Sequence, residues 1–191
     1  FNTSNQLYLI YRNGEFVEGF PKNLPTTTSM GHSLFDYNKN KKYRIMIVGD
    51  NNFLYNLDKK GKKVNGWKYI KSNNQINQPP LHFVVDDKDY ILESTTNTTT
   101  RLLALNGSTR VLFKGAESFI SPVNITEKGQ LYAITNENKL WTGDINGNTN
   151  VIELPDLLPK ERVLIYNDNY YISNNNSLLC IDSVKNEVIN F

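Results

Sequence analysis

One unit recurs five times along this chain: a short apolar strand, a polar turn and a second strand. The first strands begin at Leu7, Leu54, Leu102, Leu140 and Leu178. Successive copies are separated by roughly 40 to 48 residues, an interval that is typical of repeat architectures. The sequence therefore predicts how the chain is built before it indicates any activity.

The first two copies align without a gap over fourteen positions, Leu7–Phe20 and Leu54–Trp67. Later copies keep the pattern and end the first strand on Asn or Asp. The side chain of such a residue accepts hydrogen bonds from backbone N–H groups two residues on, and a glycine supplies positive φ where the turn needs it. The turns are Asp58–Gly61, Asn106-Gly107 and Asp144–Gly147.

Two more strand-like segments precede each of the last four units. The inner segments are Tyr43–Val48, Tyr90–Leu92, Gln130–Ile134 and Asn169–Ser173. The outer segments are Ser29–Phe35, Leu81–Val85, Ile120–Ile125 and Arg162–Tyr166. Four short antiparallel strands per repeat form the blade of a β-propeller.

The predicted fold is therefore all-β: a single propeller segment over residues 1–191. We expect four four-stranded antiparallel blades and a half blade before them. The blades are 28–67, 81–113, 120–154 and 162–191, and the half blade, 7–18, has strands Leu7–Tyr11 and Glu15–Glu18. Such a ring would not close, and open sheet edges invite pairing. We expect a larger propeller, completed by upstream residues of the same protein or by another molecule.

Charge and composition argue against several classes of function. The 21 basic residues nearly balance 19 acidic ones, and the run from Asn38 to Arg44 is interpreted as a solvated loop, so nucleic acid is not an expected partner. No apolar run approaches the length of a membrane span. The single cysteine, Cys180, lies in an apolar strand, where a buried small side chain is expected.

Residues for catalysis are few. The two histidines, His32 and His82, occupy similar places in successive outer strands, which indicates repeat geometry. A cluster formed by Asp86, Asp87 and Asp89 is explained by a turn at Asp87–Asp89. General acid–base chemistry would need a partner in a cleft. We assign no catalytic, cofactor-binding or metal-binding residue and leave the ligand-binding residues unknown.

The segment Asp36-Tyr37-Asn38-Lys39-Asn40 resembles the start of a calcium loop, but the match is incomplete. Lys41 stands where glycine would make the sharp turn, and no Glu occupies the twelfth position. We interpret the segment as a turn and leave calcium binding open. The segment Asp144–Asn148 is likewise interpreted as a hairpin turn.

Aromatic residues also recur. Phe20 and Trp67 hold the same position in successive copies, and Tyr55 and Trp141 fall in equivalent strands. Packing between neighbouring blades is the favoured interpretation. The alternative is a set of aromatic rings on one face that stack on sugars or on a peptide.

The unit from Phe53 to Trp67 resembles the repeat of PQQ-like and WD40-like propellers, in which a hairpin ends in Asp, a glycine-containing turn and Trp. More narrowly, the chain resembles the C-terminal propeller-like region of uncharacterised cell-envelope proteins from Bacteroidota. The residues that carry this likeness are Gly19–Pro21, Leu34–Tyr37, Gly66–Lys68, His82–Val85 and Lys88–Tyr90. The resemblance implies a periplasmic or outer-envelope protein, and it brings no catalytic residue.

The expected function is a non-enzymatic protein-binding or scaffolding module of the bacterial cell envelope, without a cofactor. Its partner would be a protein or the remainder of its own chain. A lectin-like carbohydrate-binding propeller is the alternative, and it predicts exposed Trp and Tyr clusters. A quinoprotein-type enzyme ranks last, because it requires a central cofactor and metal site that the sequence does not supply.

Overall fold

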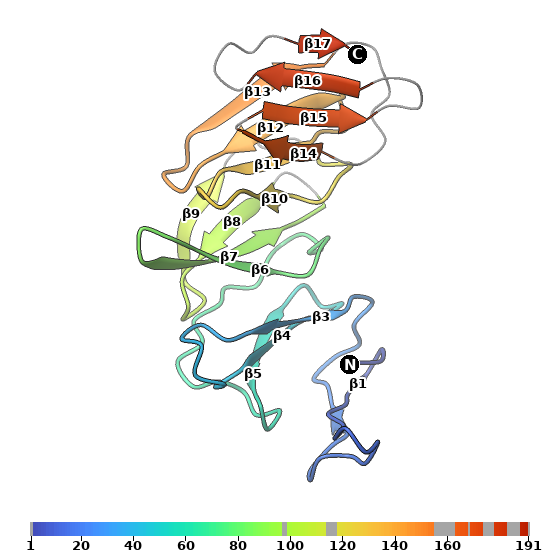
Figure 1. The fold of residues 1–191 in the computed structure, drawn as a ribbon. Coiled ribbons are helices and arrows are strands. Elements are labelled where there is room, and N and C mark those ends of the chain that lie inside the picture. The colour runs from blue at the N-terminus through green and yellow to red at the C-terminus, as the bar shows by residue number, and fades with distance from the viewer. Residues whose placement is uncertain are drawn as a thin grey trace. The chain divides into compact units, whose positions relative to one another are not determined.

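A computed structural model describes residues 2–96, 99–113, 118–154, 163–167, 169–173, 178–182 and 188–190. In these residues all regular secondary structure is β-strand, and the strands pair in sequence order into antiparallel sheets (Figure 1). No helix capable of crossing a membrane occurs in this part of the chain. The described residues form two compact units. The first contains the described residues up to 96 and residues 100–112, and the second contains residue 99 and the described residues from 113 on.

The first unit contains three sheets. Its strands are β1 (Gln6–Leu7), β2 (Lys22–Asn23), β3 (His32–Phe35), β4 (Arg44–Val48), β5 (Leu54–Asp58), β6 (Leu81–Val85), β7 (Lys88–Ser94), β8 (Thr100–Leu103) and β9 (Thr109–Phe113), whose last residue belongs to the second unit. The sheet orders are β1-β2, β3-β4-β5 and β6-β7-β8-β9. The last of these is a complete four-stranded meander of the expected blade type.

The turns after the repeated strands form by the expected mechanism. The Asp58 Oδ1 atom accepts the backbone N–H groups of Lys60 and Lys62 at 2.8 and 2.9 Å, and Gly61 has φ 70°. In the same way Asn106 Oδ1 accepts the N–H of Ser108 at 3.0 Å. These contacts confirm the turn chemistry that the repeat predicts.

The sheet β3-β4-β5 departs from the expected four strands. After the turn the chain makes one bridge to β5, between Leu57 and Lys63, and one backbone hydrogen bond from the Val64 N–H to the Asn56 carbonyl oxygen at 2.9 Å, and then diverges. The indole Nε1 of Trp67 donates to the carbonyl oxygen of Leu54 at 2.8 Å, so a side chain supplies a hydrogen bond at the edge of β5. The Trp67 side chain thus donates one of the hydrogen bonds that the expected fourth strand would have made to β5.

The N-terminal pair of strands is also shorter than expected. β1 pairs with β2 instead of continuing to Tyr11. Residues 8–18, called the N-terminal hairpin below, are joined by one bridge between Ile10 and Phe16 and by backbone hydrogen bonds from Tyr11 to Glu15 and from Val17 to Leu9.

Both faces of β4 are buried, which explains its nearly continuous apolar sequence. Ile45 and Ile47 pack with Leu57 of β5 and with Leu7 of β1. Met46 and Val48 point the other way and join a core between β3-β4-β5 and β6-β9, whose other buried members are Phe35, Leu54, Tyr69, Ile76, Ile91 and Leu103. Adjacent sheets therefore pack face to face, as propeller blades do.

The second unit contains two four-stranded sheets. Its strands are β10 (Asn124–Ile125), β11 (Leu131–Ile134), β12 (Lys139–Gly143), β13 (Thr149–Glu153), β14 (Val163–Tyr166), β15 (Asn169–Ser173), β16 (Leu178–Asp182) and β17 (Val188–Asn190). One core lies between the sheets β10-β13 and β14-β17; its members include Leu140, Ile152, Tyr170 and Ile181.

The outer strand expected at Ile120–Ile125 is interrupted. Phe119 bridges Thr135 and Asn124 pairs with Tyr132, so the four residues between Phe119 and Asn124 oppose the two between Tyr132 and Thr135. Pro122 lies in this stretch and has no N–H to donate, which accounts for the bulge.

Candidate binding sites

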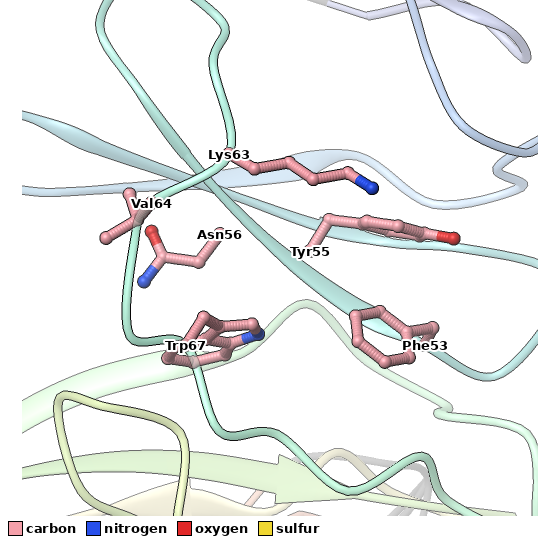
Figure 2. A pocket seen from close by; sticks show the side chains of 6 residues that line it. All are labelled: Phe53, Tyr55, Asn56, Lys63, Val64 and Trp67. Atoms are coloured by element: carbon pink, nitrogen blue, oxygen red, sulfur yellow. The ribbon is translucent and has the colours of Figure 1, made fainter.

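A pocket lies at the edge of β5 where the fourth strand is missing. It has a volume of about 350 Å³ and is lined by Phe53, Tyr55, Asn56, Lys63, Val64 and Trp67 (Figure 2). We call it the Trp67 pocket. β5 supplies Tyr55 and Asn56, the segment paired beside it supplies Lys63 and Val64, and Trp67 follows where the chain has left the strand edge. The pocket therefore exists because the chain leaves the strand edge after Val64.

The aromatic side of this pocket is a packed cluster. The rings of Phe53 and Tyr55 have centroids 4.9 Å apart, and Phe53 meets Tyr69 edge-on at 5.1 Å. Trp67 stacks on Tyr69 at 6.2 Å with an angle of 11° between the rings. The Tyr55 hydroxyl accepts a hydrogen bond from Asn51 at 2.9 Å. These contacts hold the ring positions in place, so the pocket is formed without a ligand.

Asn56 supplies the unusual polar group. The side chain is 3% exposed, and its Oδ1 atom is buried without a hydrogen-bond partner in the described residues. Figure 2 shows the amide between Val64 and Trp67. A buried carbonyl oxygen normally has a donor, because leaving it unpaired costs free energy.

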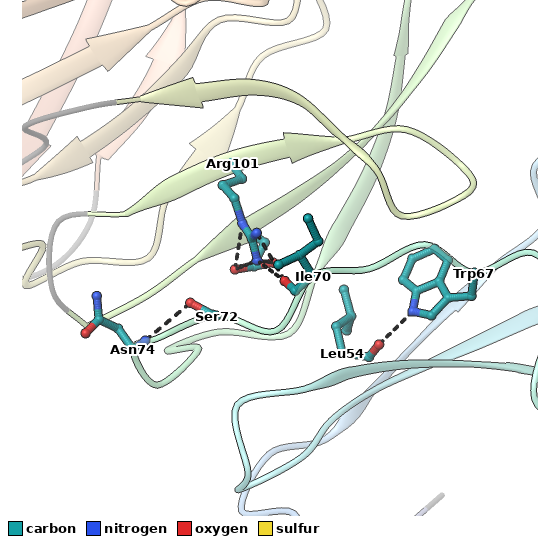
Figure 3. A network of polar contacts seen from close by, with 7 residues as sticks. Leu54, Trp67, Ile70, Ser72, Asn74 and Arg101 are labelled. Atoms are coloured by element: carbon teal, nitrogen blue, oxygen red, sulfur yellow. Dashed lines mark hydrogen bonds and ion pairs between the residues drawn. The ribbon is translucent and has the colours of Figure 1, made fainter.

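A buried ion pair lies under Tyr69. The guanidinium Nη2 of Arg101 is 2.8 and 2.7 Å from the two Glu93 carboxylate oxygens, and the guanidinium also donates to the Ile70 carbonyl oxygen (Figure 3). It lies 5.1 Å from the centre of the Tyr69 ring. Burial raises the pKa of Glu93, and the contact with Arg101 partly offsets that increase. The pair anchors the segment that carries the aromatic wall.

A cluster of lysines borders the pocket and was missed by the sequence analysis. The turn after β5 contains four lysines in five residues, Lys59, Lys60, Lys62 and Lys63, all exposed. Three of them line a second depression of about 430 Å³ together with Lys22 and the N-terminal hairpin. The signal was present in the sequence as Lys-Lys-Gly-Lys-Lys.

The N-terminal hairpin exposes large apolar side chains. Tyr11 is 55% exposed and Phe16 54%, and Leu9 and Ile10 are each 37% exposed. The Ile10–Phe16 bridge places these two side chains on one face, where the Tyr8 ring lies 5.9 Å from that of Phe16. Several exposed apolar groups on one short hairpin are a feature of binding surfaces.

The histidines occupy structural positions. His32 Nδ1 lies 2.8 Å from the Asn2 amide oxygen, and His82 Nε2 lies 2.7 Å from a carboxylate oxygen of Asp89. The His82 ring is packed against Phe35 and Tyr37, at 5.4 and 4.8 Å between centroids. Burial raises the pKa of Tyr37 well above its usual range. The two histidines do not share a site.

The aspartate turn is displaced from the expected position. Asp86 and Asp87 form a two-residue loop with positive φ at both residues, and β7 begins at Lys88. The turn expected at Asp87–Asp89 is therefore wrong by one residue, because two consecutive left-handed residues close the hairpin directly. Asp89 lies within β7 and contacts His82 instead of capping a turn.

The two loops considered for calcium use their carboxylates internally. Asp36 accepts the N–H groups of Asn40 and Lys41 at 3.0 and 2.9 Å. Asp144 Oδ1 accepts those of Asn146 and Asn148 at 2.8 and 3.0 Å. In the described part of the chain no group of three or more His, Cys, Asp or Glu residues is placed to hold a metal ion.

The recurring aromatic residues and the single cysteine that the sequence analysis singled out are buried or packed. Trp141 contacts Phe113 and Phe119 at 5.4 and 5.1 Å, within the second unit. Phe20 packs near Gly61, and Trp67 packs near Gly107, so the recurring aromatic contacts the glycine of the following turn in both cases. These contacts support blade packing as the role of the repeated rings. Cys180 is free and buried.

The sequence matches no protein-family model, and none of the curated proteins compared with it matches. Solved structures with a similar fold include BamB from Moraxella catarrhalis, with a TM-score of 0.66 and 14% identity over 98% of this chain and 55% of that one. BBS1N in complex with ARL6DN has a TM-score of 0.65 and 12% identity, over 98% of this chain and 61% of that one. AztD from Citrobacter koseri, in its apo form, has a TM-score of 0.61 and 11% identity, over 92% of this chain and 49% of that one.

BamB and BBS1N are β-propellers, and the likeness establishes the fold class of this chain as an all-β propeller segment. The chain spans between about half and three fifths of the length of these structures.

Proposed function

We propose that this chain is a non-enzymatic protein-binding or scaffolding segment of a propeller, and that its partner docks on the N-terminal hairpin. The supporting observation is the exposure of Phe16 (54%) and Tyr11 (55%) on a hairpin held by one bridge. The similar BBS1N structure was solved in complex with ARL6DN, so that propeller binds a protein.

The chemistry of the hairpin defines the partner. Burying apolar surface is favourable by about 25 cal/mol per Å², and an exposed strand pair offers unpaired backbone groups to an added strand. The partner is therefore an apolar, strand-bearing protein surface. Further blades of the same protein and a separate protein both have this chemistry.

We place the protein in the bacterial periplasm or outer envelope. This proposal rests on the resemblance to envelope proteins of Bacteroidota and on the fold shared with two bacterial propellers, from Moraxella catarrhalis and Citrobacter koseri. Fractionation of cells that express the full-length gene product tests it. Recovery in the cytosolic fraction alone would contradict the location without touching the binding proposal.

Site-specific photo-crosslinking tests the docking surface. A photoreactive amino acid replaces Phe16 in the full-length protein expressed in its own cells, and mass spectrometry identifies the crosslinked peptides. We expect one dominant crosslink to an apolar strand. A peptide of the same gene product identifies the remainder of the chain as the partner, and a peptide of another gene product identifies a separate protein.

The matched control carries the photoreactive residue at Lys71, which is exposed on the same unit. The proposal predicts that the photoreactive residue at position 71 does not crosslink to the peptide captured from position 16. It also predicts that Ile10→Asp suppresses the crosslink from position 16. Equal crosslinking from both positions, or none from Phe16, would refute docking on the hairpin.

The carbohydrate alternative is favoured by one specific observation, the aromatic pocket with an unpaired amide oxygen at Asn56. It concerns a different surface from the hairpin. The quinoprotein-type enzyme is not proposed, because no observation in the described residues favours it.

A further inference from the structure

The Trp67 pocket combines three features that a small ligand would use. Aromatic rings form one wall, a buried amide oxygen lacks a donor, and a lysine ammonium group stands at the rim. From this combination we propose that the pocket binds an acidic saccharide unit, a hexuronic acid or an oligosaccharide that contains one. The proposal goes beyond the protein-binding function and does not depend on it.

The size of the pocket limits the ligand. A volume of about 350 Å³ lies at the lower end of the range for small-molecule sites. One or two sugar rings fit this range, whereas a folded protein surface would insert no more than a side chain. The walls are preorganised by the Trp67–Tyr69 stack and by the indole hydrogen bond to Leu54.

The aromatic wall suits a ligand with both apolar and polar faces. Phe53, Tyr55 and Trp67 present ring surface, which favours contact with C–H groups. The indole N–H is already bonded to Leu54 and the Tyr55 hydroxyl to Asn51. The rings therefore offer apolar carbon surface instead of polar groups, and a sugar ring has an apolar face of C–H groups to match.

Asn56 selects for a hydroxyl group. Its Oδ1 atom is buried without a donor, and the residue is 3% exposed. A purely apolar ligand would leave this oxygen unpaired and gain nothing from it. A sugar hydroxyl can donate to the amide oxygen while the ring stacks once the amide turns toward the pocket, because the oxygen is buried in this structure.

Lys63 selects for negative charge. Its side chain lines the pocket, and it forms no ion pair within the described residues. Lys59, Lys60 and Lys62 of the same turn make the local potential positive. The nearest carboxylate in this turn, Asp58, accepts the backbone N–H groups of Lys60 and Lys62. A carboxylate on the sugar ring would give the Lys63 ammonium group an ion-pair partner.

Calorimetry with two sugars that differ by one group tests the proposal. The probes are methyl β-glucuronide and methyl β-glucoside, and acetate controls for the carboxylate alone. At low salt we expect the glucuronide to bind about fivefold more tightly than the glucoside, which is the effect of one exposed charge pair. Acetate should bind more weakly than either sugar.

Tryptophan resonances locate the binding. The chain has two tryptophans, so the indole N–H signals of Trp67 and Trp141 provide a reporter and an internal control in a heteronuclear NMR titration. We expect the glucuronide to shift the Trp67 signal in a saturable way and to leave the Trp141 signal in place. A shift of Trp141 alone, or of neither signal, would overturn the proposal.

Two lysine variants separate a specific contact from general charge. Lys63→Met should remove the fivefold preference for the glucuronide and leave glucoside affinity unchanged. Lys59→Met, which removes the same charge from the same turn outside the pocket, should keep most of the preference. Equal effects of the two variants, or an acetate affinity equal to that of the glucuronide, would reduce the site to a nonspecific anion patch.

Asn56→Leu should weaken both sugars by about tenfold, because the hydroxyl loses its acceptor. Unchanged affinity in a folded Asn56→Leu variant would refute the role of the amide. If that variant does not fold, the comparison of Lys63→Met with Lys59→Met still decides, since both side chains are exposed.

Discussion

The six-membered ring of Trp67 lies directly over Gly107, so that a Cβ atom on Gly107 would come within 2.9 Å of its Cε3 atom. Gly107 also has φ 83°, in the left-handed region. The glycine is therefore required twice, by its backbone conformation and by the ring above it. Because Trp67 also lines the pocket, the turn of one repeat fixes a binding residue of the preceding one.

Gly107→Ala should destabilise the protein by about 2 to 5 kcal/mol, the sum of left-handed strain and overpacking. Gly66→Ala is the matched control, because Gly66 has φ 76° but open space around its Cα. The control should cost only about 1 to 2 kcal/mol. Urea unfolding of both variants measures the difference, and equal losses would show that Trp67 moves aside freely.

Arg101→Met should destabilise the protein by about 3 to 5 kcal/mol at neutral pH, because Glu93 is left buried and charged without its partner. Arg110→Met is the control: Arg110 is exposed and lies 5.6 Å from the centre of the Tyr90 ring. The control should lose less than about 1 kcal/mol. Comparable losses in the two variants would contradict a special role for the buried pair.

The pH dependence of Arg101→Met follows from the raised pKa of Glu93. Burial raises this pKa and Arg101 lowers it, so removing Arg101 should raise it further. The folded variant then takes up a proton more readily than the unfolded chain. The loss in free energy of unfolding relative to wild type should be largest above the pKa of Glu93 in the folded variant. It should shrink as the pH falls toward the ordinary carboxyl range. Urea titrations across this pH range check the sign.

Asp144→Ala should lose about 1 kcal/mol through the hydrogen bonds that Asn146 and Asn148 donate to the carboxylate. Burial alone would raise the pKa of Asp144, but these hydrogen bonds lower it overall. The carboxylate therefore stabilises the fold above its unfolded-state pKa, and this contribution disappears as the pH falls through the folded-state pKa. Thermal unfolding at neutral and acidic pH should show the difference from wild type shrinking in acid. Asp144→Asn keeps an acceptor and should show a smaller deficit.

Calcium should not stabilise the Asp36 loop. Both carboxylate oxygens of Asp36 accept backbone N–H groups, which leaves fewer lone pairs for a cation. We expect the melting temperature to be the same with millimolar calcium and with a chelator. Asp36→Ala should lower it equally under both conditions. A calcium-dependent rise that Asp36→Ala abolishes would identify a metal site after all.

Local chemistry made much of this fold predictable from sequence. Asp58, Asn106 and Asp144 close their turns with their own side chains, and such contacts need only neighbouring residues. The nearly continuous apolar run of β4 is typical of a strand buried on both faces. These features depend on near neighbours in the chain, and a blade is a series of such strands joined by such turns.

The candidate sites could not be read in the same way. The Trp67 pocket exists because the chain leaves the edge of β5 after Val64. The Asn56 amide oxygen is buried without a donor in the described residues, a state that depends on the surrounding fold. The Glu93–Arg101 pair becomes an anchor only through Ile70, about thirty residues earlier in the chain. The sequence by itself determined the repeat, its turns and its strands, because those follow from short-range hydrogen bonding and side-chain periodicity. Tertiary structure alone decided where a strand fails to form, because that outcome depends on which distant side chains compete for the same backbone groups.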